Sequence, residues 1–227
     1  MNGLLLPGNA TPADVANGKT FSGGAGIEVA GTYIPPVGLI QAVQASSTST
    51  STTLTFTPVS SASNFVLSFS NPAYTLSTIA ATAGTWSQIV AYAPAHGSIL
   101  YVYRCNALTA GIAVTVTITL TNSGQSLDAT LLEFAPFATF GAPVTNCMTA
   151  TGTELAIGTA SSTQLQFIVF GTNATTGCYR VTPGPWSVIT ATSLQTGIAF
   201  QFLSGSSSPT LSTTNSSSYL AAALLGA

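Results

Sequence analysis

Charge is what this chain has least of. Charged residues make up 4% of its 227 residues, against roughly 25% in an average soluble protein. Three basic and five acidic side chains give a formal net charge of −2. Nucleic acids and anionic membranes are bound through clustered Lys and Arg, so neither is an expected partner. Hydrophobic residues reach 46%, so the chain has ample material for a core, and Ser, Thr, Asn and Gln must cover its surface.

The sequence also has no long apolar run. No stretch approaches the roughly 18 residues of a membrane-spanning helix. The first residues, "MNGLLLPGN", have no basic segment and too short a hydrophobic run for a secretory signal peptide. We therefore expect the chain either to stay in the cytoplasm or to leave by another route, such as release inside a virus particle.

Cysteine is scarce as well. Cys105, Cys147 and Cys178 have no metal-site spacing, and an odd count argues against a disulfide framework. We expect buried thiols that act as small apolar residues. Cys147 with Cys178 is the candidate pair for oxidation, and their redox state stays open.

Residues for catalysis are few. His96 is the single histidine and lies in a turn, "APAHGS", and no serine has the GxSxG context of a nucleophile elbow. Asp128 and Glu133 lie an odd number of positions apart, so on one strand they face opposite sides of a sheet. No P-loop, EF-hand or His/Cys cluster is present. We expect no enzyme, no cofactor and no metal.

The two arginines have acidic residues to pair with. Arg104 and Arg180 each have Glu133 or Glu154 as a candidate partner. A single salt bridge at a sheet edge or a subunit contact is the expected role.

Short alternating runs indicate the fold class. "VTVTITLT", from Val114 to Thr121, places apolar residues on one face and threonines on the other, the pattern of a strand half buried in an antiparallel sheet. Runs such as "ILYVY", "QFIVF" and "IAFQF" are similar, and helix-period patterns are absent. Many short, closely spaced strands predict an all-β antiparallel β-sandwich or jelly roll.

Four blocks of sequence recur in the same order, roughly 90–100 residues apart, which indicates an internal repeat. The pairs are "FVLSFSN" with "FIVFGTN", "GTWSQI" with "GPWSVI", "HGSILYVY" with "TGIAFQF", and "TNSGQSLDATLLEF" with "TNSSSYLAAALLGA". We expect Trp86 to superimpose on Trp186 and Leu127 on Leu220. The two units form either two sandwiches or the halves of one, with one compact body preferred.

Trp86 and Trp186 have two readings. Aromatic rings stack on sugars, so the pair is a candidate glycan-binding site. Equivalent positions in the two units favour a packing role instead.

The N-terminal stretch holds three of the eight charges, Asp14, Lys19 and Glu28. Thr11 is a favourable helix N-cap residue and Asn17-Gly18 favours the end of a helical turn, after which "KTF" and "IEVAGTY" predict two short strands. Such a structure is too small to be stable alone, so we expect an attachment arm. Its contact residues would be Asp14, Val15, Lys19, Phe21, Ile27, Glu28 and Tyr33.

These observations give a division of the chain. Residues 1–34 are the arm, and residues 35–52, rich in Pro, Ser and Thr, are a linker. Residues 53–140 and 146–227 are the two repeated β units.

The segment "ATPADVANGKTFSGGAGIEVAGTY" resembles a module of bacteriophage head-fibre and tail-associated structural proteins. Ala16-Asn17 depart from its pattern, where a leucine is more usual. The rest of the chain resembles, more diffusely, duplicated β-sandwich domains of phage and bacterial surface proteins. The matching positions of the module are Ala10, Thr11, Ala13, Asp14, Val15, Gly18, Lys19, Thr20, Phe21, Gly31 and Thr32.

The resemblance implies a non-enzymatic virion surface protein: a capsid decoration, head-fibre or tail-fibre-like subunit. Its partners would be major capsid or tail subunits and further copies of itself, with a trimer expected by analogy with fibres, and a host-surface glycan. The alternatives are a carbohydrate-binding adhesion module and a self-assembling bacterial surface or filament protein.

Overall fold

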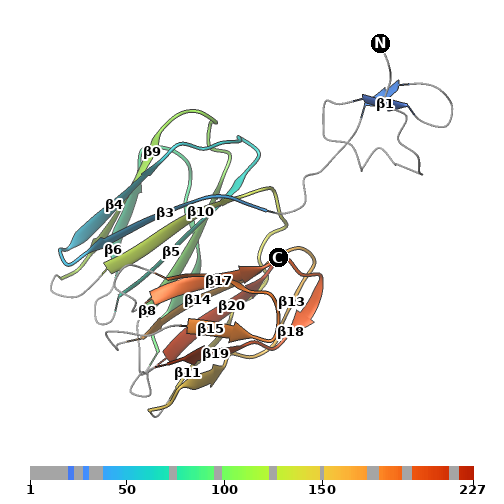
Figure 1. Cartoon of the computed structure of the whole chain (residues 1–227). Coiled ribbons are helices and arrows are strands. Elements are labelled where there is room, and N and C mark those ends of the chain that lie inside the picture. Colours follow the sequence, from blue (N-terminus) through green and yellow to red (C-terminus); the bar gives the residue numbers. More distant parts are fainter. Residues whose placement is uncertain are drawn as a thin grey trace. The chain divides into compact units, whose positions relative to one another are not determined.

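The computed structural model describes residues 20–22, 28–30, 38–71, 76–94, 99–122, 127–148, 151–172, 179–190, 196–214 and 220–227. The chain divides into two units, Met1–Gly38 and Leu39–Ala227. Every regular element in these ranges is a β-strand (Figure 1), and the pairings within the sheets are antiparallel. The predicted all-β antiparallel class is confirmed. Among the described residues, no helix is long and apolar enough to span a bilayer.

The described residues of the N-terminal unit form a small sheet. β1 (Thr20–Ser22) pairs antiparallel with β2 (Glu28–Ala30), and Phe21 lies opposite Val29. The two short strands predicted here are therefore present. The helical turn predicted over residues 11–18 lies outside the described residues.

The first sandwich runs from Leu39 to Phe134 and has two sheets. One has five strands in the order β3-β10-β5-β8-β7, and the other has three in the order β4-β9-β6. The strands are β3 (Leu39–Ser47), β4 (Ser51–Phe56), β5 (Asn64–Asn71), β6 (Leu76–Ala81), β7 (Ser87–Tyr92), β8 (Ile99–Asn106), β9 (Val114–Leu120) and β10 (Leu127–Phe134).

The second sandwich runs from Val144 to the C-terminus. Its five-stranded sheet has the order β11-β20-β14-β17-β16, its three-stranded sheet β12-β19-β15, and β13 pairs with β18. The strands are β11 (Val144–Cys147), β12 (Glu154–Ala156), β13 (Ala160–Ser162), β14 (Gln166–Thr172), β15 (Tyr179–Thr182), β16 (Ser187–Thr190), β17 (Thr196–Gln201), β18 (Gly205–Ser207), β19 (Thr210–Thr213) and β20 (Leu220–Gly226).

Strand registers relate the two sandwiches residue by residue. In the first sandwich, Ser87, which follows Trp86, lies opposite Arg104 on the next strand. Arg104 lies opposite Val66, and Val66 lies opposite Leu132. In the second sandwich, Ser187, which follows Trp186, lies opposite Phe200. Phe200 lies opposite Phe167, and Phe167 lies opposite Leu225. Leu132 is five positions after Leu127, and Leu225 is five after Leu220. Matching the tryptophans therefore also matches Leu127 with Leu220.

The same registers correct two repeat blocks: against the match of "HGSILYVY" with "TGIAFQF", which aligns Tyr103 with Phe202, they place Tyr103 level with Ala199. They align Phe69 with Phe170, both in the cores, whereas the match of "FVLSFSN" with "FIVFGTN" aligns Phe65 with Phe167. Phe65 belongs to the first core, but Phe167 contacts Phe140 between the sandwiches. A shift of one residue moves a side chain to the other face of a strand, so the sequence match at this block is displaced by one position.

The predicted linker over residues 35–52 is wrong for most of its length. Leu39–Ser47 form β3, which pairs along the whole of β10, and β4 begins at Ser51. Val43 and Ala45 pack against the first core. Backbone hydrogen bonds to a strand more than eighty residues away hold this segment, and its composition does not reveal them. The first sandwich thus begins at Leu39, not at residue 53.

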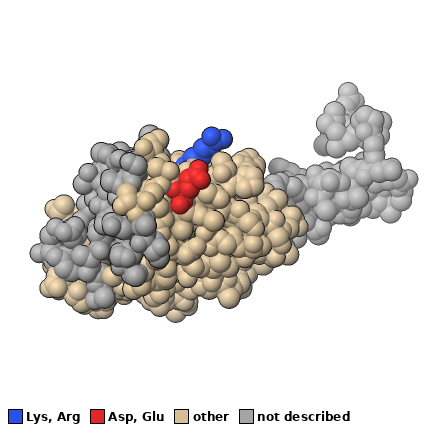
Figure 2. Space-filling view, turned by 90° about the horizontal axis from the view of Figure 1, so that it is seen from below, with Lys and Arg blue, Asp and Glu red and all other residues tan. Residues whose placement is uncertain are grey.

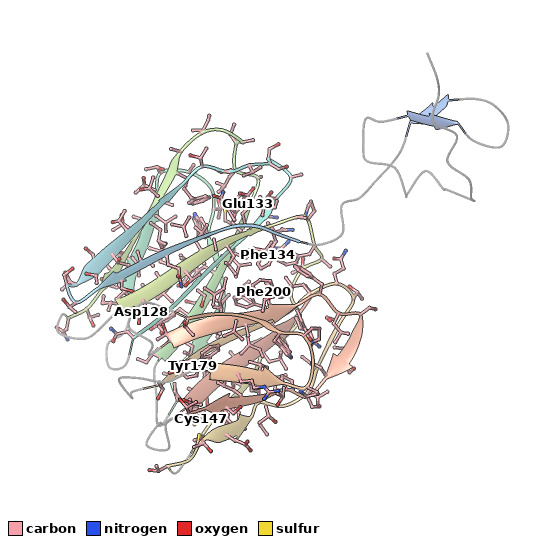
Figure 3. All side chains as sticks on the ribbon, viewed as in Figure 1. Asp128, Glu133, Phe134, Cys147, Tyr179 and Phe200 are labelled. Carbon is pink, nitrogen blue, oxygen red and sulfur yellow. The ribbon has the colours of Figure 1, made fainter. Side chains whose placement is uncertain are left out.

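The two sandwiches pack against each other through their five-stranded sheets. The side chains of β5, β10, β14, β17 and β20 are buried along their whole length, whereas β9 alternates between buried and half-buried residues as predicted. Phe134 and Phe200 meet in this seam at 5.5 Å between ring centroids (Figure 3). Leu39–Ala227 therefore form one compact unit in which the two sandwiches share a buried seam.

Candidate functional site

Two of the predicted arm residues lie in the small N-terminal sheet. Phe21 is on β1 and Glu28 is on β2, where Glu28 faces Ser22 across the pair. Asp14, Val15, Lys19, Ile27 and Tyr33 lie outside the described residues. Their proposed contacts stay predictions.

Trp86 and Trp186 occupy matching places. Each comes directly before a strand, β7 or β16, and each is half-buried against the core of its own sandwich. The Trp86 indole N–H donates to the carbonyl of Ala83 at 3.4 Å, and the Trp186 indole N–H donates to the carbonyl of Pro183 at 2.9 Å. Both bonds span three residues, so both rings cap their cores in the same way.

A cleft lies beside Trp86. It has a volume of about 460 Å³ and is lined by β6, the β6–β7 connection and Tyr103 of β8. Ser77, Thr78 and Thr85 in its wall are exposed, so it opens to solvent. Ligand pockets usually measure about 300–1,000 Å³, and this cleft is therefore large enough for a small organic ligand.

The second sandwich differs at this place. Gln88 lies opposite Tyr103 on β8, and the matching residue Val188 lies opposite Ala199 on β17. The second sandwich thus carries a methyl group where the first has a phenol ring. Trp86 has an aromatic neighbour in its cleft that Trp186 lacks at the corresponding position.

Glu133 is completely buried, and its carboxylate is occupied by the protein itself. Its Oε1 accepts hydrogen bonds from the backbone N–H of Val59 at 3.0 Å and of Ser60 at 3.1 Å. The Gln41 side-chain amide also donates to it. Carboxylates with several N–H donors are strongly held, so Glu133 fastens the connection after β4 to the end of β10.

Arg104 lies on the seam side of β8. Its Nη2 donates to Asn64 Oδ1 at 2.7 Å, and its guanidinium carbon lies 5.2 Å from the ring centroid of Phe137. Burial lowers the pKa of the Arg104 guanidinium. Arg104 therefore does not form the expected salt bridge with Glu133. Arg180 and Glu154 are both exposed and both lie opposite Ser212 of β19, and their pairing stays a prediction.

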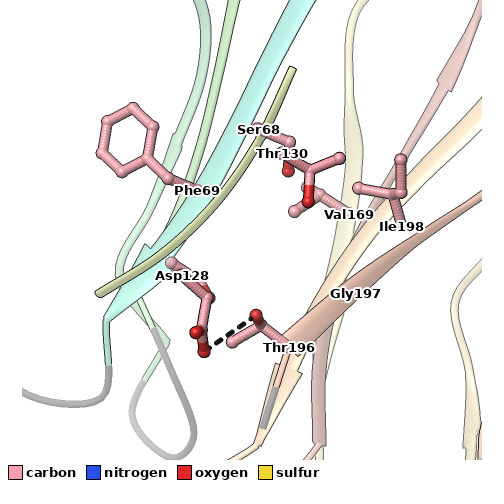
Figure 4. Close-up of a pocket in the computed structure, with 9 residues that line it drawn as sticks. Ser68, Phe69, Asp128, Thr130, Val169, Thr196, Gly197 and Ile198 are labelled. Carbon is pink, nitrogen blue, oxygen red and sulfur yellow. Dashed lines mark hydrogen bonds between the residues drawn. The ribbon is translucent and has the colours of Figure 1, made fainter. Parts of the chain in front are cut away.

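Asp128 joins the two sandwiches. Its Oδ1 accepts from Ser46 Oγ at 2.6 Å, and its Oδ2 accepts from Thr196 Oγ1 at 3.3 Å (Figure 4). A cavity beside it, with Ser68 and Ser70 in its wall, has a volume of about 10 Å³, the size of a single water molecule. This polar pocket is too small for a ligand and belongs to the seam.

The thiols and nearby phenols are only partly accessible. Cys105 is a buried free thiol whose pKa is raised by burial, as expected, while Cys147 is free and half-buried. Tyr92 lies against Cys147, and burial, with a smaller contribution from that thiol, raises the pKa of Tyr92 to about 12. Cys178 and His96 lie outside the described residues.

Sequence reasoning missed the cleft, although part of its signal was present. The run "ILYVY" alternates, and Tyr101 and Tyr103 therefore share a face. That this face meets Trp86 depends on the pairing of β7 with β8, which no local pattern specifies.

Among the described residues, no group of three His, Cys, Asp or Glu side chains is placed to hold a metal ion. The chain matches no protein-family model, and no curated protein or solved structure is significantly similar to it.

Proposed function

We propose that this protein is a non-enzymatic structural component of a bacteriophage particle, exposed on the virion as a capsid decoration, head-fibre or tail-fibre-like subunit. The observation that carries the proposal is the use of its buried carboxylates. Glu133 fastens a strand connection and Asp128 joins two sandwiches, so both serve a rigid body.

The architecture supports the same role. β3 pairs with β10, β4 with β9 and β5 with β8. Such nested pairing supports the proposal of a jelly roll, a fold found in viral capsid and lectin domains. The second sandwich repeats this order. We infer a tandem duplication of one jelly roll whose copies packed sheet to sheet.

The surface suits assembly. Of the five charged residues that follow Tyr33, Asp128 and Glu133 are buried, and Figure 2 shows a face with very little red or blue. Surfaces with so few charges resist association weakly, and salt has little effect on their contacts. This supports a closed homo-oligomer, for which a trimer is proposed by analogy with fibre-like virion proteins. Residues 1–34 would dock it on neighbouring virion subunits.

Imaging of the purified assembly that contains this chain tests the proposal. An antibody against the Leu39–Ala227 body should label the outside of a phage head or tail. Labelling of a bacterial surface filament, or recovery of the chain only as a free monomer, would contradict it.

A further inference from the structure

We propose that the cleft beside Trp86 binds a neutral pyranose sugar of a cell-surface glycan. This inference goes beyond the structural role and does not depend on it. It rests on the shape, the aromatic wall and the charge of a cleft found in the first sandwich.

The aromatic wall is fixed in place. Trp86 packs on the first core and its indole N–H is held by Ala83, so the ring needs little ordering when a ligand arrives. Gly84 has a φ of +78°, and a Cβ there would lie 2.5 Å from Leu108 Cδ2. The turn that presents Trp86 is thus locked by its contact with the core.

A pyranose ring has one face of C–H groups, which pack well on the face of an aromatic ring, and a rim of hydroxyls that need hydrogen-bond partners. The cleft supplies both. Ser77, Thr78 and Thr85 offer exposed hydroxyls beside Trp86. The Tyr103 O–H donates to Gln88 Oε1 at 2.6 Å, which orients the phenol and leaves its oxygen free to accept a bond.

Charge selects the class of sugar. The described residues that line the cleft include no Asp, Glu, Lys or Arg. A carboxylated or sulfated sugar would lose hydration there without gaining a charged partner. Neutral hexoses and N-acetylhexosamines fit, and acidic sugars do not.

The second sandwich supplies a matched control. Trp186 caps its core as Trp86 does, but Ala199 takes the place of Tyr103. Substitution at either tryptophan removes similar packing, and only substitution at Trp86 removes the proposed sugar platform. The chain has two tryptophans in all, so Trp186→Phe leaves Trp86 as its single tryptophan reporter.

The test uses the full chain on an array of neutral oligosaccharides ending in glucose, galactose, mannose or N-acetylglucosamine, with sialylated and sulfated glycans beside them. We expect binding to at least one neutral glycan and to none of the acidic ones. Titration of the best neutral glycan should change the fluorescence of Trp186→Phe. Trp86→Leu, which keeps an apolar side chain but no aromatic face, should weaken binding by roughly tenfold or more, the loss of one aromatic stacking contact.

A second variant tests binding without changing a side chain that packs on the core. Ser77→Glu places a carboxylate at the exposed mouth of the cleft without touching the core, and it should also abolish binding. Wild-type affinity in Trp86→Leu would overturn the inference, and so would wild-type affinity in Ser77→Glu. Failure of the wild-type chain to bind any neutral glycan would overturn it as well. None of these results affects incorporation into a particle, so the proposed structural function is tested separately.

Discussion

Thr196 donates a hydrogen bond from its Oγ1 to Asp128 Oδ2 at 3.3 Å and so connects the second sandwich to the first. The other carboxylate oxygen accepts from Ser46 on the neighbouring strand β3. One buried side chain therefore holds both an edge strand and the opposing sandwich.

Replacing Asp128 should weaken the body. Asp128→Ala leaves Ser46 and Thr196 with fewer partners, and we expect a loss of about 1–3 kcal/mol in the free energy of unfolding. Asp128→Asn keeps an acceptor oxygen and should lose less. Urea denaturation measures both, and equal stability of wild type and Asp128→Ala would remove Asp128 from the account of the seam.

Truncation of an aromatic side chain in the seam should destabilise both sandwiches together. Phe200→Ala removes a ring packed edge-on against Phe134, and cavity formation of this kind costs about 3–5 kcal/mol. Phe202 is 44% exposed at the edge of the same aromatic cluster. It provides a graded comparison, and Phe202→Ala should cost about 1 kcal/mol. If the sandwiches fold as one unit, calorimetry of Phe200→Ala should give a single transition at lower temperature. Two separate transitions would show independent sandwiches.

The Glu133 contacts predict a local effect. Glu133→Ala deprives the backbone N–H groups of Val59 and Ser60 of their acceptor, and we expect a cost of about 3 kcal/mol or more. Hydrogen exchange at Val59 and Ser60 should become faster. Glu154→Gln, at an exposed position, should change stability by less than about 0.5 kcal/mol. Unchanged exchange at both amides would contradict the assigned role.

Alkaline pH should destabilise the fold through Tyr92. Its pKa is raised from 10.0 to about 12 in the folded chain, so the folded state keeps a proton that the unfolded state releases. The stabilisation is complete below pH 10, the unfolded value, and is lost as pH rises toward the folded value. Ultraviolet titration of wild type and Tyr92→Phe, with unfolding curves between these pH values, tests this. A pH dependence identical in both proteins would assign the effect to other groups.

The sequence predicts those strands of this fold that face water on one side. Val116 and Ile118 alternate with threonines, and β9 has that pattern in the structure. The strands of the seam are buried on both faces, so their sequences do not alternate between apolar and polar residues. Their sequences therefore do not indicate how the two sandwiches pack. The composition of β3 predicts a linker because its inward residues, Val43 and Ala45, are small. The stability of β3 comes from pairing with the distant strand β10.

The candidate site was predictable only in part. Trp86 and Trp186 stand out because their blocks repeat, yet the distinction between them depends on Tyr103 and Ala199. Strand pairing brings these residues to the same place beside each tryptophan. Asp128 has no local motif at all, because its partners come from β3 and β17.

Two truncations separate the arm from the body. A chain that begins at residue 35 keeps β3 complete, and its melting temperature should stay close to that of the full chain. A chain that begins at residue 53 loses β3 and the start of β4. It should unfold at a much lower temperature, because the edge of β10 is left unpaired. Equal melting temperatures for the two truncated chains would mean that β3 contributes nothing to the body.

Occupancy in purified phage particles tests the central claim most directly. Full-length chain and the chain that begins at residue 35 are supplied separately during particle assembly, and each is counted per particle by quantitative mass spectrometry. The account predicts a fixed number of full-length copies and almost none of the folded, truncated chain. Full occupancy by the truncated chain would place the anchor in the body, and particles without the full-length chain would contradict the virion role itself.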